Sequence, residues 1–249
     1  MTKALKICGI VLGAAILICI IAYIIILIFV PGLFLYLHTL KECPNINDKI
    51  EEYPYYDTVV PDDYQKVKAG VFYISGPMDD YLVGRTSSVK TVFKNSERNF
   101  MVMSTSSSAG SVDFSDSDYP DLDKSDYIHF FESIKYNYPQ NNKEMKIFIR
   151  NGLNLRLSLH LRGKDKKVYK QFASKKEMVS GLEKIYAYKK GNVDCFVCNC
   201  SISDSKKSGT FWSIDAYTGD NAETVNKISI SSNDIDEIKK VIASVEMAE

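Results

Sequence analysis

Residues 7 to 30 read ICGIVLGAAILICIIAYIIILIFV, and this stretch decides how the rest of the chain is interpreted. It contains no charge and no proline, and its most polar groups are thiols and the Tyr23 hydroxyl. A helix of this length rises about 36 Å, which is enough to cross the roughly 30 Å hydrocarbon core of a bilayer. Because only a helix satisfies its own backbone amides in lipid, the stretch predicts a transmembrane helix from Ile7 to Val30.

The sequence favours an uncleaved signal-anchor over a removable signal peptide. Signal peptides have an apolar run of about 7 to 15 residues and a small-residue cleavage site, and neither feature is found here. Lys3 and Lys6 precede the run, whereas Lys41 is the first charge after it and stands beside Glu42. This asymmetry predicts that residues 1–6 form a short cytoplasmic tail and that the C-terminal domain lies outside the cytoplasm of the cell, at the cell membrane.

A pair of small residues in the same helix bears on self-association. Gly9 and Gly13 are four residues apart, the spacing that lets two membrane helices approach closely. One expectation is therefore a homodimer through Gly9 and Gly13. The alternative is that both glycines are ordinary lipid-facing residues, because Ile16 and Leu17 end the small-residue face.

Composition excludes some partners for the rest of the 249-residue chain. Acidic and basic residues balance at 31 each, which argues against nucleic-acid binding. Residues 31–63 contain Pro44, Pro54 and Pro61 among charges and tyrosines, so we expect a semi-extended juxtamembrane stalk. The remaining residues, 64–249, are enough for one extracytoplasmic domain.

That domain is expected to have an α+β fold. Runs of β-branched and aromatic residues between turn residues predict strands at 70–75, 88–94, 99–104, 168–172, 193–202, 210–217 and 225–231. Apolar residues at helical spacing predict helices at 126–138 and 234–247, and a capping box of Ser174 with Glu177 predicts a helix at 174–190. We therefore expect a mostly antiparallel sheet covered by about three helices.

A hairpin is predicted from residues 145–149 and 153–161, because leucine alternates with polar residues throughout the second run. A two-residue turn at Asn151 and Gly152 would place charges on the leucine face. A three-residue loop, with Gly152 left-handed, keeps that face apolar and is preferred.

Three stretches together resemble the fold of the photosystem subunit PsbP and its bacterial relatives such as DcrB. They are VFYISGPMDDYLVG from Val71, VKTVFKNSERNFMVMS from Val89 and DIDEIKKVIASV from Asp234. The resemblance implies a PsbP/DcrB-like α+β fold for the region after Tyr64. It implies no functional residue, because the family shares no catalytic activity, and the membrane span is a departure from its cleaved signals and lipid anchors.

A calcium loop is the best metal candidate. Residues 104–111 and 113–126 form a low-complexity acidic loop, and its end, DLDKSDYIHFFE, matches calcium ligands at Asp121, Asp123, Ser125 and Glu132. The match lacks the turn glycine, which is replaced by Asp126. The alternative is an ordinary loop in which Ser125 or Asp126 caps the next helix. No other cofactor is expected.

Four cysteines would face the outside, where disulfides form: Cys43, Cys195, Cys198 and Cys200. Cys195 and Cys198 have redox spacing, but redox pairs place a thiolate at a helix N-terminus and this stretch is rich in strand formers. On a strand, Cys198 and Cys200 share one face and Cys195 takes the other. We expect a structural disulfide or buried thiols, and the alternative is a membrane-tethered thiol-disulfide oxidoreductase using Cys195 and Cys198.

No catalytic signature emerges, so no catalytic residue is assigned and an enzyme is the less favoured class. After residue 41 the only histidines are His129 and His160, which leaves little for a His-dependent triad. The polar residues that alternate with the leucines from residue 153 on would form one face of the predicted strand: Asn154, Arg156, Ser158, His160 and Arg162. This face is either an anion site or simply the solvated side of the strand. The sequence favours an interaction or sensing domain whose partner is an unknown protein or envelope ligand.

Overall fold

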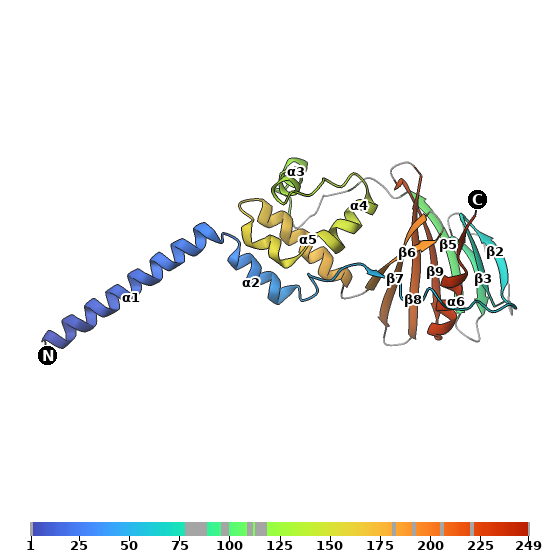
Figure 1. The fold of residues 1–249 in the computed structure, drawn as a ribbon, viewed down its shortest axis with the longest axis horizontal. Coiled ribbons are helices and arrows are strands. Elements are labelled where there is room, and N and C mark those ends of the chain that lie inside the picture. Colours follow the sequence, from blue (N-terminus) through green and yellow to red (C-terminus); the bar gives the residue numbers. More distant parts are fainter. Residues whose placement is uncertain are drawn as a thin grey trace. The chain divides into compact units, whose positions relative to one another are not determined.

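The computed structural model describes residues 2–77, 89–95, 100–108, 112, 119–180, 183–190, 193–204, 207–219 and 222–248. The chain, coloured along its length in Figure 1, forms two compact units. Unit 1 contains Met1–Asn47, Phe114–Tyr138 and Leu153–Lys175, and unit 2 contains Asp48–Asp113, Pro139–Gly152 and Lys176–Glu249. The sequence predicts one domain after residue 64, whereas the chain passes through each unit three times.

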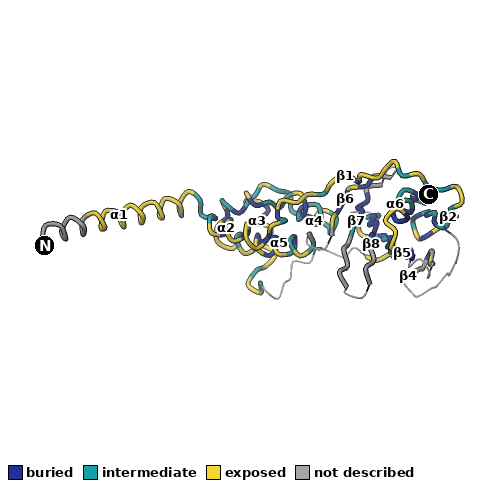
Figure 2. Tube along the Cα trace, turned by 90° about the horizontal axis from the view of Figure 1, so that it is seen from below, coloured by how far each residue is buried: buried dark blue, intermediate teal, exposed yellow. Residues whose placement is uncertain are grey.

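Helix α1 runs from Thr2 to Phe29. Its described side chains from Val11 to Ile26 are all exposed, as the yellow tube of Figure 2 shows. Large apolar side chains are among them, such as Leu12 at 65% and Ile18 at 67% of full exposure. Among the described residues there is no helix with the length and apolar character needed to span a membrane. The membrane span and the signal-anchor stay hypotheses.

The other parts of unit 1 are also helical. They are α2 (Leu33–Glu42), α3 (Lys124–Ser133), the 3-10 helix η2 (Leu155–His160) and α5 (Asp165–Ser180), whose last residues, from Lys176 on, belong to unit 2. An aromatic cluster holds α3 against α5: Phe130 and Phe131 each place their ring centroid within 5.9 Å of that of Phe172. Tyr127 donates a 2.6 Å hydrogen bond from its hydroxyl to Gln171 Oε1. Tyr127, Phe130 and Phe131 are among the residues that the helical spacing of 126–138 predicts to share a face.

Residues 31–63, expected to form a semi-extended stalk, contain regular structure and buried side chains, and the stalk beside a membrane stays a prediction. They include α2 and the short strand β1, and they bury Leu35, Ile46 and Tyr53. Leu33 to Leu40 therefore packs on protein through one face of a helix. Apolar residues between the prolines, rather than the prolines themselves, determine how this segment folds.

A seven-stranded sheet dominates unit 2, with the order β1-β6-β7-β8-β9-β5-β4. Its described pairings are antiparallel except for β1 with β6. A second sheet has the order β10-β3-β2. The strands are β1 (Glu51–Glu52), β2 (Gln65–Ala69), β3 (Phe72–Gly76), β4 (Val89–Asn95), β5 (Phe100–Ser108), β6 (Glu183–Lys190), β7 (Val193–Asp204), β8 (Lys207–Thr218), β9 (Thr224–Ser232) and β10 (Glu246–Met247). The expected α+β class is confirmed.

The core of unit 2 joins the two sheets through α6 (Ile235–Ser244). Ile238 and Ile242 on this helix are fully buried, in one cluster with Ile74 of β3 and Ile214 of β8. Burying each such side chain contributes about 1.5 to 3 kcal/mol. Asp234 caps α6 by accepting a 2.8 Å hydrogen bond from the Asp236 amide. The helix predicted at 234–247 is therefore present, but it ends at Ser244, and Glu246 and Met247 form β10.

The hairpin predicted from 145–149 and 153–161 is wrong, and neither turn register exists. Helix α4 (Asn142–Ile147), the π-helix η1 (Phe148–Gly152) and η2 take its place. Asn154 Oδ1 caps η2 by accepting a 3.1 Å hydrogen bond from the Arg156 amide. Leu155 and Ser158, three residues apart on this 3-10 helix, are buried. The leucine alternation therefore does not mark the face of a sheet.

Two further predictions, the strand at 168–172 and the helix at 174–190, are wrong for one reason. Val168, Tyr169 and Phe172 are all buried, and their spacing is that of one helical face. They belong to α5, which begins at Asp165 and already includes Ser174 in its interior. Ser174 consequently starts no helix, and residues 183–190 form β6. Similarly, β5 extends to Ser108, so the first part of the predicted acidic loop is strand; residues 113–118 lie outside the described residues.

Candidate functional site

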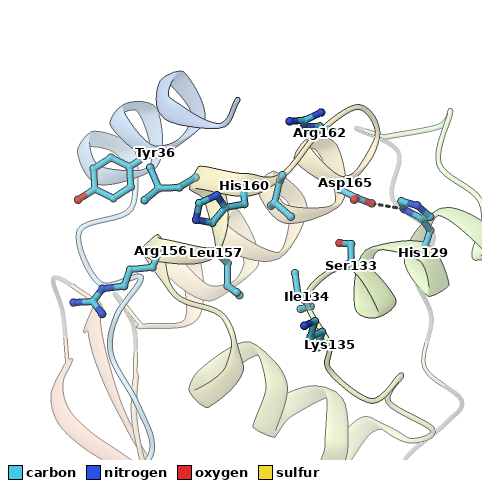
Figure 3. A pocket seen from close by; sticks show the side chains of 12 residues that line it. Tyr36, His129, Ser133, Ile134, Lys135, Arg156, Leu157, His160, Arg162 and Asp165 are labelled. Carbon is cyan, nitrogen blue, oxygen red and sulfur yellow. Dashed lines mark hydrogen bonds and ion pairs between the residues drawn. The ribbon is translucent and has the colours of Figure 1, made fainter. Parts of the chain in front are cut away.

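A pocket of about 780 Å³ opens on the surface of unit 1 (Figure 3). This volume lies within the range of about 300–1,000 Å³ that is typical of small-molecule sites. Its polar lining comes from distant parts of unit 1: Tyr36 of α2, His129 and Ser133 of α3 with Lys135 after it, Arg156 and His160 of η2, and Arg162 and Asp165 just before and at the start of α5. Ile134, Leu157, Leu159 and Leu161 add an apolar part.

Positive charge predominates in this lining. Lys135, Arg156 and Arg162 carry permanent charges, and among the lining residues only Asp165 is a carboxylate. Within the described residues, neither Lys135 nor Arg156 forms an ion pair. The chain as a whole is neutral, with 31 residues of each sign. The pocket therefore concentrates positive charge locally.

The single carboxylate is already engaged by a histidine. Asp165 Oδ1 lies 2.9 Å from His129 Nδ1, the contact drawn as a dashed line in Figure 3. The Asp165 side chain is buried, whereas His129 is largely exposed. The hydrogen bond to Asp165 and its negative charge raise the pKa of His129 above its ordinary value. Protonated His129 would neutralise Asp165 and leave the rest of the lining cationic.

Close backbone contact positions η2 beside α2. The Gly32 amide donates a 2.9 Å hydrogen bond to the Leu159 carbonyl. A Cβ atom at Gly32 would stand only 1.7 Å from the Ser158 carbonyl oxygen, so glycine is required for this approach. Ser158 turns inward, and its Oγ donates to the Leu155 carbonyl at 2.7 Å. The neighbouring exposed positions, Arg156 and His160, consequently face the pocket.

Two side chains near the pocket bind the end of α1. Arg162 donates from Nη2 to the Ile28 carbonyl at 3.2 Å, and Lys166 donates from Nζ to the Pro31 carbonyl at 2.7 Å. Carbonyls at a helix C-terminus have no partner within the helix, so cationic donors stabilise them. The pocket therefore lies next to the C-terminal end of the apolar helix.

The structure engages the predicted calcium ligands with protein donors. Asp123 caps α3, accepting from the Ser125 amide at 2.8 Å and from Ser125 Oγ at 2.6 Å. Asp126 completes the capping box, so the cap is Asp123 and not Ser125 or Asp126 as expected. Asp121 pairs with Lys167 at 2.5 Å, and Glu132 is exposed. No cluster of three or more His, Cys, Asp or Glu that could hold a metal ion occurs among the described residues, and calcium binding stays a prediction.

The cysteines of β7 lie on opposite faces of the large sheet. Cys195 is buried in the cluster that includes α6, and Cys198 is buried with Ile185 and Phe196 on the other side. Both are thiols in the structure, as is the buried Cys43. The side chain of Cys200 lies outside the described part. Because Cys195 and Cys198 project in opposite directions, they are not placed to bridge each other.

A second charged group lies beside Cys198 in unit 2. Lys146 Nζ is 3.1 Å from Asp215 Oδ2 and 3.5 Å from Cys198 Sγ. Burial lowers the pKa of Lys146, but Cys198 and Asp215 outweigh it and raise the pKa above its usual value. The lysine also lies 5.3 Å from the centre of the Phe196 ring. This arrangement is an ion pair between a half-buried lysine and a buried carboxylate.

Comparison with known proteins gives no family for the chain. No family model matches it, and no curated protein matches it. A crystal structure from Bacteroides thetaiotaomicron VPI-5482 at 1.50 Å resolution is similar at a TM-score of 0.33 and 10% identity, over 75% of this chain and 49% of that chain. The chain thus spans about half the length of that structure. The PsbP/DcrB resemblance stays a prediction.

Sequence reasoning found part of the pocket and missed the rest. Arg156, His160 and Arg162 come from the polar face that was a candidate for anion binding, although a 3-10 helix and not a strand presents them. Asn154 and Ser158 serve as a cap and as a buried hydroxyl instead. Lys135 and Tyr36 were missed, because they come from distant parts of the chain. Lys135 follows the end of α3 with a positive φ of 56°, and no feature of the sequence predicts this backbone conformation.

Proposed function

We propose that this chain is a single-pass membrane-anchored protein that presents an α+β interaction or sensing domain outside the cytoplasm. The exposed apolar surface of α1 carries this proposal. From Val11 to Ile26 its described side chains lie open on all sides, with Ile18, Leu12 and Val11 above 60% exposure. Water disfavours an apolar surface of this extent, and a lipid bilayer would cover it.

The sequence supplies the remaining support. The uncharged run from Ile7 to Val30 is long enough for a bilayer, and α1 contains it up to Phe29. Lys3 and Lys6 before the run favour a cytoplasmic N-terminus. The lipid bilayer is therefore the first partner that we propose, and the residues after α1 would stand on its far side.

A fractionation experiment tests the anchor. The full chain should remain in the membrane pellet at alkaline pH, and a reporter active only outside the cytoplasm should be active when fused after Glu249. Each lysine placed at the centre of a membrane helix costs about 2.5 to 3.5 kcal/mol of insertion, so the double variant Ile18→Lys/Ile25→Lys should release the protein. Ile235→Lys, an equally exposed isoleucine on α6, is the matched control and should not. Release of the unchanged chain, or a silent reporter, would contradict the proposal.

The pocket favours binding over catalysis as the role of the domain. It contains cationic and apolar side chains but no nucleophile paired with a base among the described residues. The rival proposal is a thiol-disulfide oxidoreductase using Cys195 and Cys198, and the opposite faces of these thiols weigh against it. Thiol counting on the full chain separates the two: a reversible two-electron titration lost in Cys195→Ser would favour the oxidoreductase.

Self-association of the anchor is a separate part of this proposal. A Cβ at Gly13 would meet no atom within 4 Å, so that position is open to a second helix. The surroundings of the other position, Gly9, lie outside the described part. A homodimer through Gly9 and Gly13 predicts that Gly13→Ile abolishes self-association of the full chain in a membrane two-hybrid assay, and that Ala22→Ile does not.

A further inference from the structure

We propose that the pocket of unit 1 binds an organic phosphate, whose phosphate oxygens accept hydrogen bonds from its cationic lining. Arg156, His160 and Arg162 are the donors available, and Figure 3 shows Arg156 and Arg162 on either side of His160 rather than meeting at one point. The apolar residues of the pocket would contact the organic part of the ligand. This inference deepens the proposed function, and it rests on membrane anchoring only for the choice between two sources of the ligand.

The charge of the lining selects an anion. Arg156 is exposed and its side chain has no carboxylate partner within the described residues. His160 is likewise exposed, and Arg162 uses one guanidinium nitrogen for the Ile28 carbonyl and keeps its other donors. Guanidinium groups present planar pairs of donors that match phosphate oxygens. The one carboxylate, Asp165, faces His129 at 2.9 Å.

The size and the apolar part of the pocket select an organic ligand over a bare ion. A volume of about 780 Å³ is far larger than inorganic phosphate requires. Leu157, Leu159 and Ile134 line it and offer no hydrogen-bonding group from their side chains. Tyr36 adds an aromatic ring with a polar tip, which suits the boundary between a phosphate and its carbon substituent.

The place of the pocket in the fold narrows the source of the phosphate. Arg162 and Lys166 hold the carbonyls of Ile28 and Pro31 at the end of the apolar helix. If α1 spans a bilayer, that end lies at the depth of the lipid headgroups, where phosphate groups are concentrated. A lipid headgroup and a soluble phosphate ester share the chemistry that the pocket recognises. Experiment must distinguish these two sources.

The test is a binding titration of the full chain in neutral detergent micelles. Two probes are used, glycerol 3-phosphate and dihexanoyl phosphatidic acid, with glycerol as the uncharged reference. Heat of binding gives the affinity, and the ring resonances of ¹³C-labelled histidine report whether the probe reaches His160. The variants are Arg156→Gln and His160→Gln. Lys170→Gln, an exposed lysine of α5 outside the pocket, is the matched control.

We expect saturable binding of at least one probe, a shift of the His160 resonance, and a loss of about tenfold in affinity for each pocket variant but not for Lys170→Gln. Binding of glycerol 3-phosphate establishes a soluble phosphate ester as sufficient, and binding of phosphatidic acid alone establishes a lipid headgroup. The absence of saturable binding of both probes, or equal affinity in the pocket variants and the control, would overturn the inference.

This result is independent of the reporter and fractionation tests. A chain that is released from membranes yet binds glycerol 3-phosphate through Arg156 would lose the proposed anchor and keep the pocket. A membrane-bound chain that binds neither probe would keep the anchor and lose the pocket. Circular dichroism of each variant confirms that the fold is unchanged, so a loss of affinity refers to the side chain.

Discussion

The ammonium group of Lys176 donates a 2.8 Å hydrogen bond to the backbone carbonyl of Arg150 in the interior of unit 2. Both side chains are buried, Lys176 completely. Burial, together with the positive charge of Arg150, lowers the pKa of Lys176 from its ordinary value of 10.5 to about 8. A charged lysine in this place costs free energy of folding, which makes it a sensitive probe of the unit.

Replacing this lysine by methionine should stabilise unit 2 at pH 7. A shift from 10.5 to about 8 corresponds to about 3 kcal/mol of desolvation cost, and the lost hydrogen bond offsets about 1 kcal/mol of the gain. Below pH 8 both states of the wild type hold the proton and the cost is complete. Between pH 8 and 10.5 the unfolded state holds more protons, so wild-type stability rises and the advantage of Lys176→Met disappears.

The measurement is urea unfolding of the full chain in micelles, followed by the fluorescence of Trp212. This is the only tryptophan of the chain, and it is buried in the core of unit 2. Lys170→Met, on the exposed face of the same helix, should change stability by less than about 0.5 kcal/mol. A difference between Lys176→Met and wild type that does not depend on pH would contradict the account.

Breaking the ion pair between Lys146 and Asp215 should destabilise the same unit. Lys146→Met would leave the buried carboxylate of Asp215 with the more distant Lys227, at 3.7 Å, and with long hydrogen bonds from Ser213 and Cys198. Removing one partner of a buried pair costs about 3 kcal/mol. Lys146→Met/Asp215→Asn should lose less than the two single variants added together. Fluorescence of Trp212 during urea unfolding gives all four stabilities, and strictly additive losses would show that the pair is not coupled.

The cap of α3 predicts a smaller effect in unit 1. Asp123→Ala removes the acceptor for the amides of Ser125 and Asp126, and loss of an N-cap costs about 1 kcal/mol. Asp123→Asn should retain most of the stability, because its side-chain oxygen still accepts. Thermal unfolding followed by far-ultraviolet circular dichroism compares these with Lys124→Ala, the next residue, which should melt like wild type. Equal melting temperatures for Asp123→Ala and Lys124→Ala would show that the cap does not stabilise α3.

The pair of His129 and Asp165 predicts a shifted titration. Its raised pKa means that the protonated imidazole stabilises the fold fully below the unfolded-state pKa of about 6.5, and that this stabilisation is lost as pH rises through the folded pKa. The ring resonance of His129 in the full chain should therefore titrate above pH 6.5. In Asp165→Asn the midpoint should move down towards the ordinary value. A midpoint that ignores Asp165→Asn would mean that the contact is absent in solution.

Glycine at position 32 is a steric requirement that can be tested. Gly32→Ala places a Cβ where the Ser158 carbonyl lies, so α2 and η2 must separate and the Gly32 to Leu159 hydrogen bond is lost. We expect a loss of more than about 2 kcal/mol, seen as a lower melting temperature. Gly13→Ala, whose Cβ would meet no atom within 4 Å, is the control and should leave the melting temperature of the units unchanged.

Sequence alone predicted most of the strands, for a local reason. In β7, β8 and β9 both faces are buried, over 195–198, 212–216 and 228–230, so the signal in each segment is a run of β-branched and aromatic residues between turn residues. The stripe of α6, with Ile238 and Val241, carries the helical period equally clearly. Where one face of an element is buried against the core, its period identifies the element.

The errors lie where the period is ambiguous or where the partner is distant. The leucines of 153–161 alternate, but Leu153 and Leu155 are buried while Leu157 and Leu159 line the pocket, so one pattern serves two environments. The partner that decides the matter, α2, lies more than one hundred residues earlier in the chain. The same distance hid Tyr36 from any local search for the site. Its contribution depends on tertiary packing.

The C-terminal end of α1 is hydrogen-bonded directly to residues at and next to the pocket. Three hydrogen bonds, from Gly32, Arg162 and Lys166, fasten the last turn of α1 and the residues after it to the segment around η2. Because these contacts are direct, a force that tilts or pulls α1 would also act on η2, which carries Arg156 and His160. The relation also runs in reverse, because a ligand that holds η2 would restrain the tilt of α1. If the pocket takes the proposed ligand, tension along α1 and occupancy of the pocket would be linked quantities.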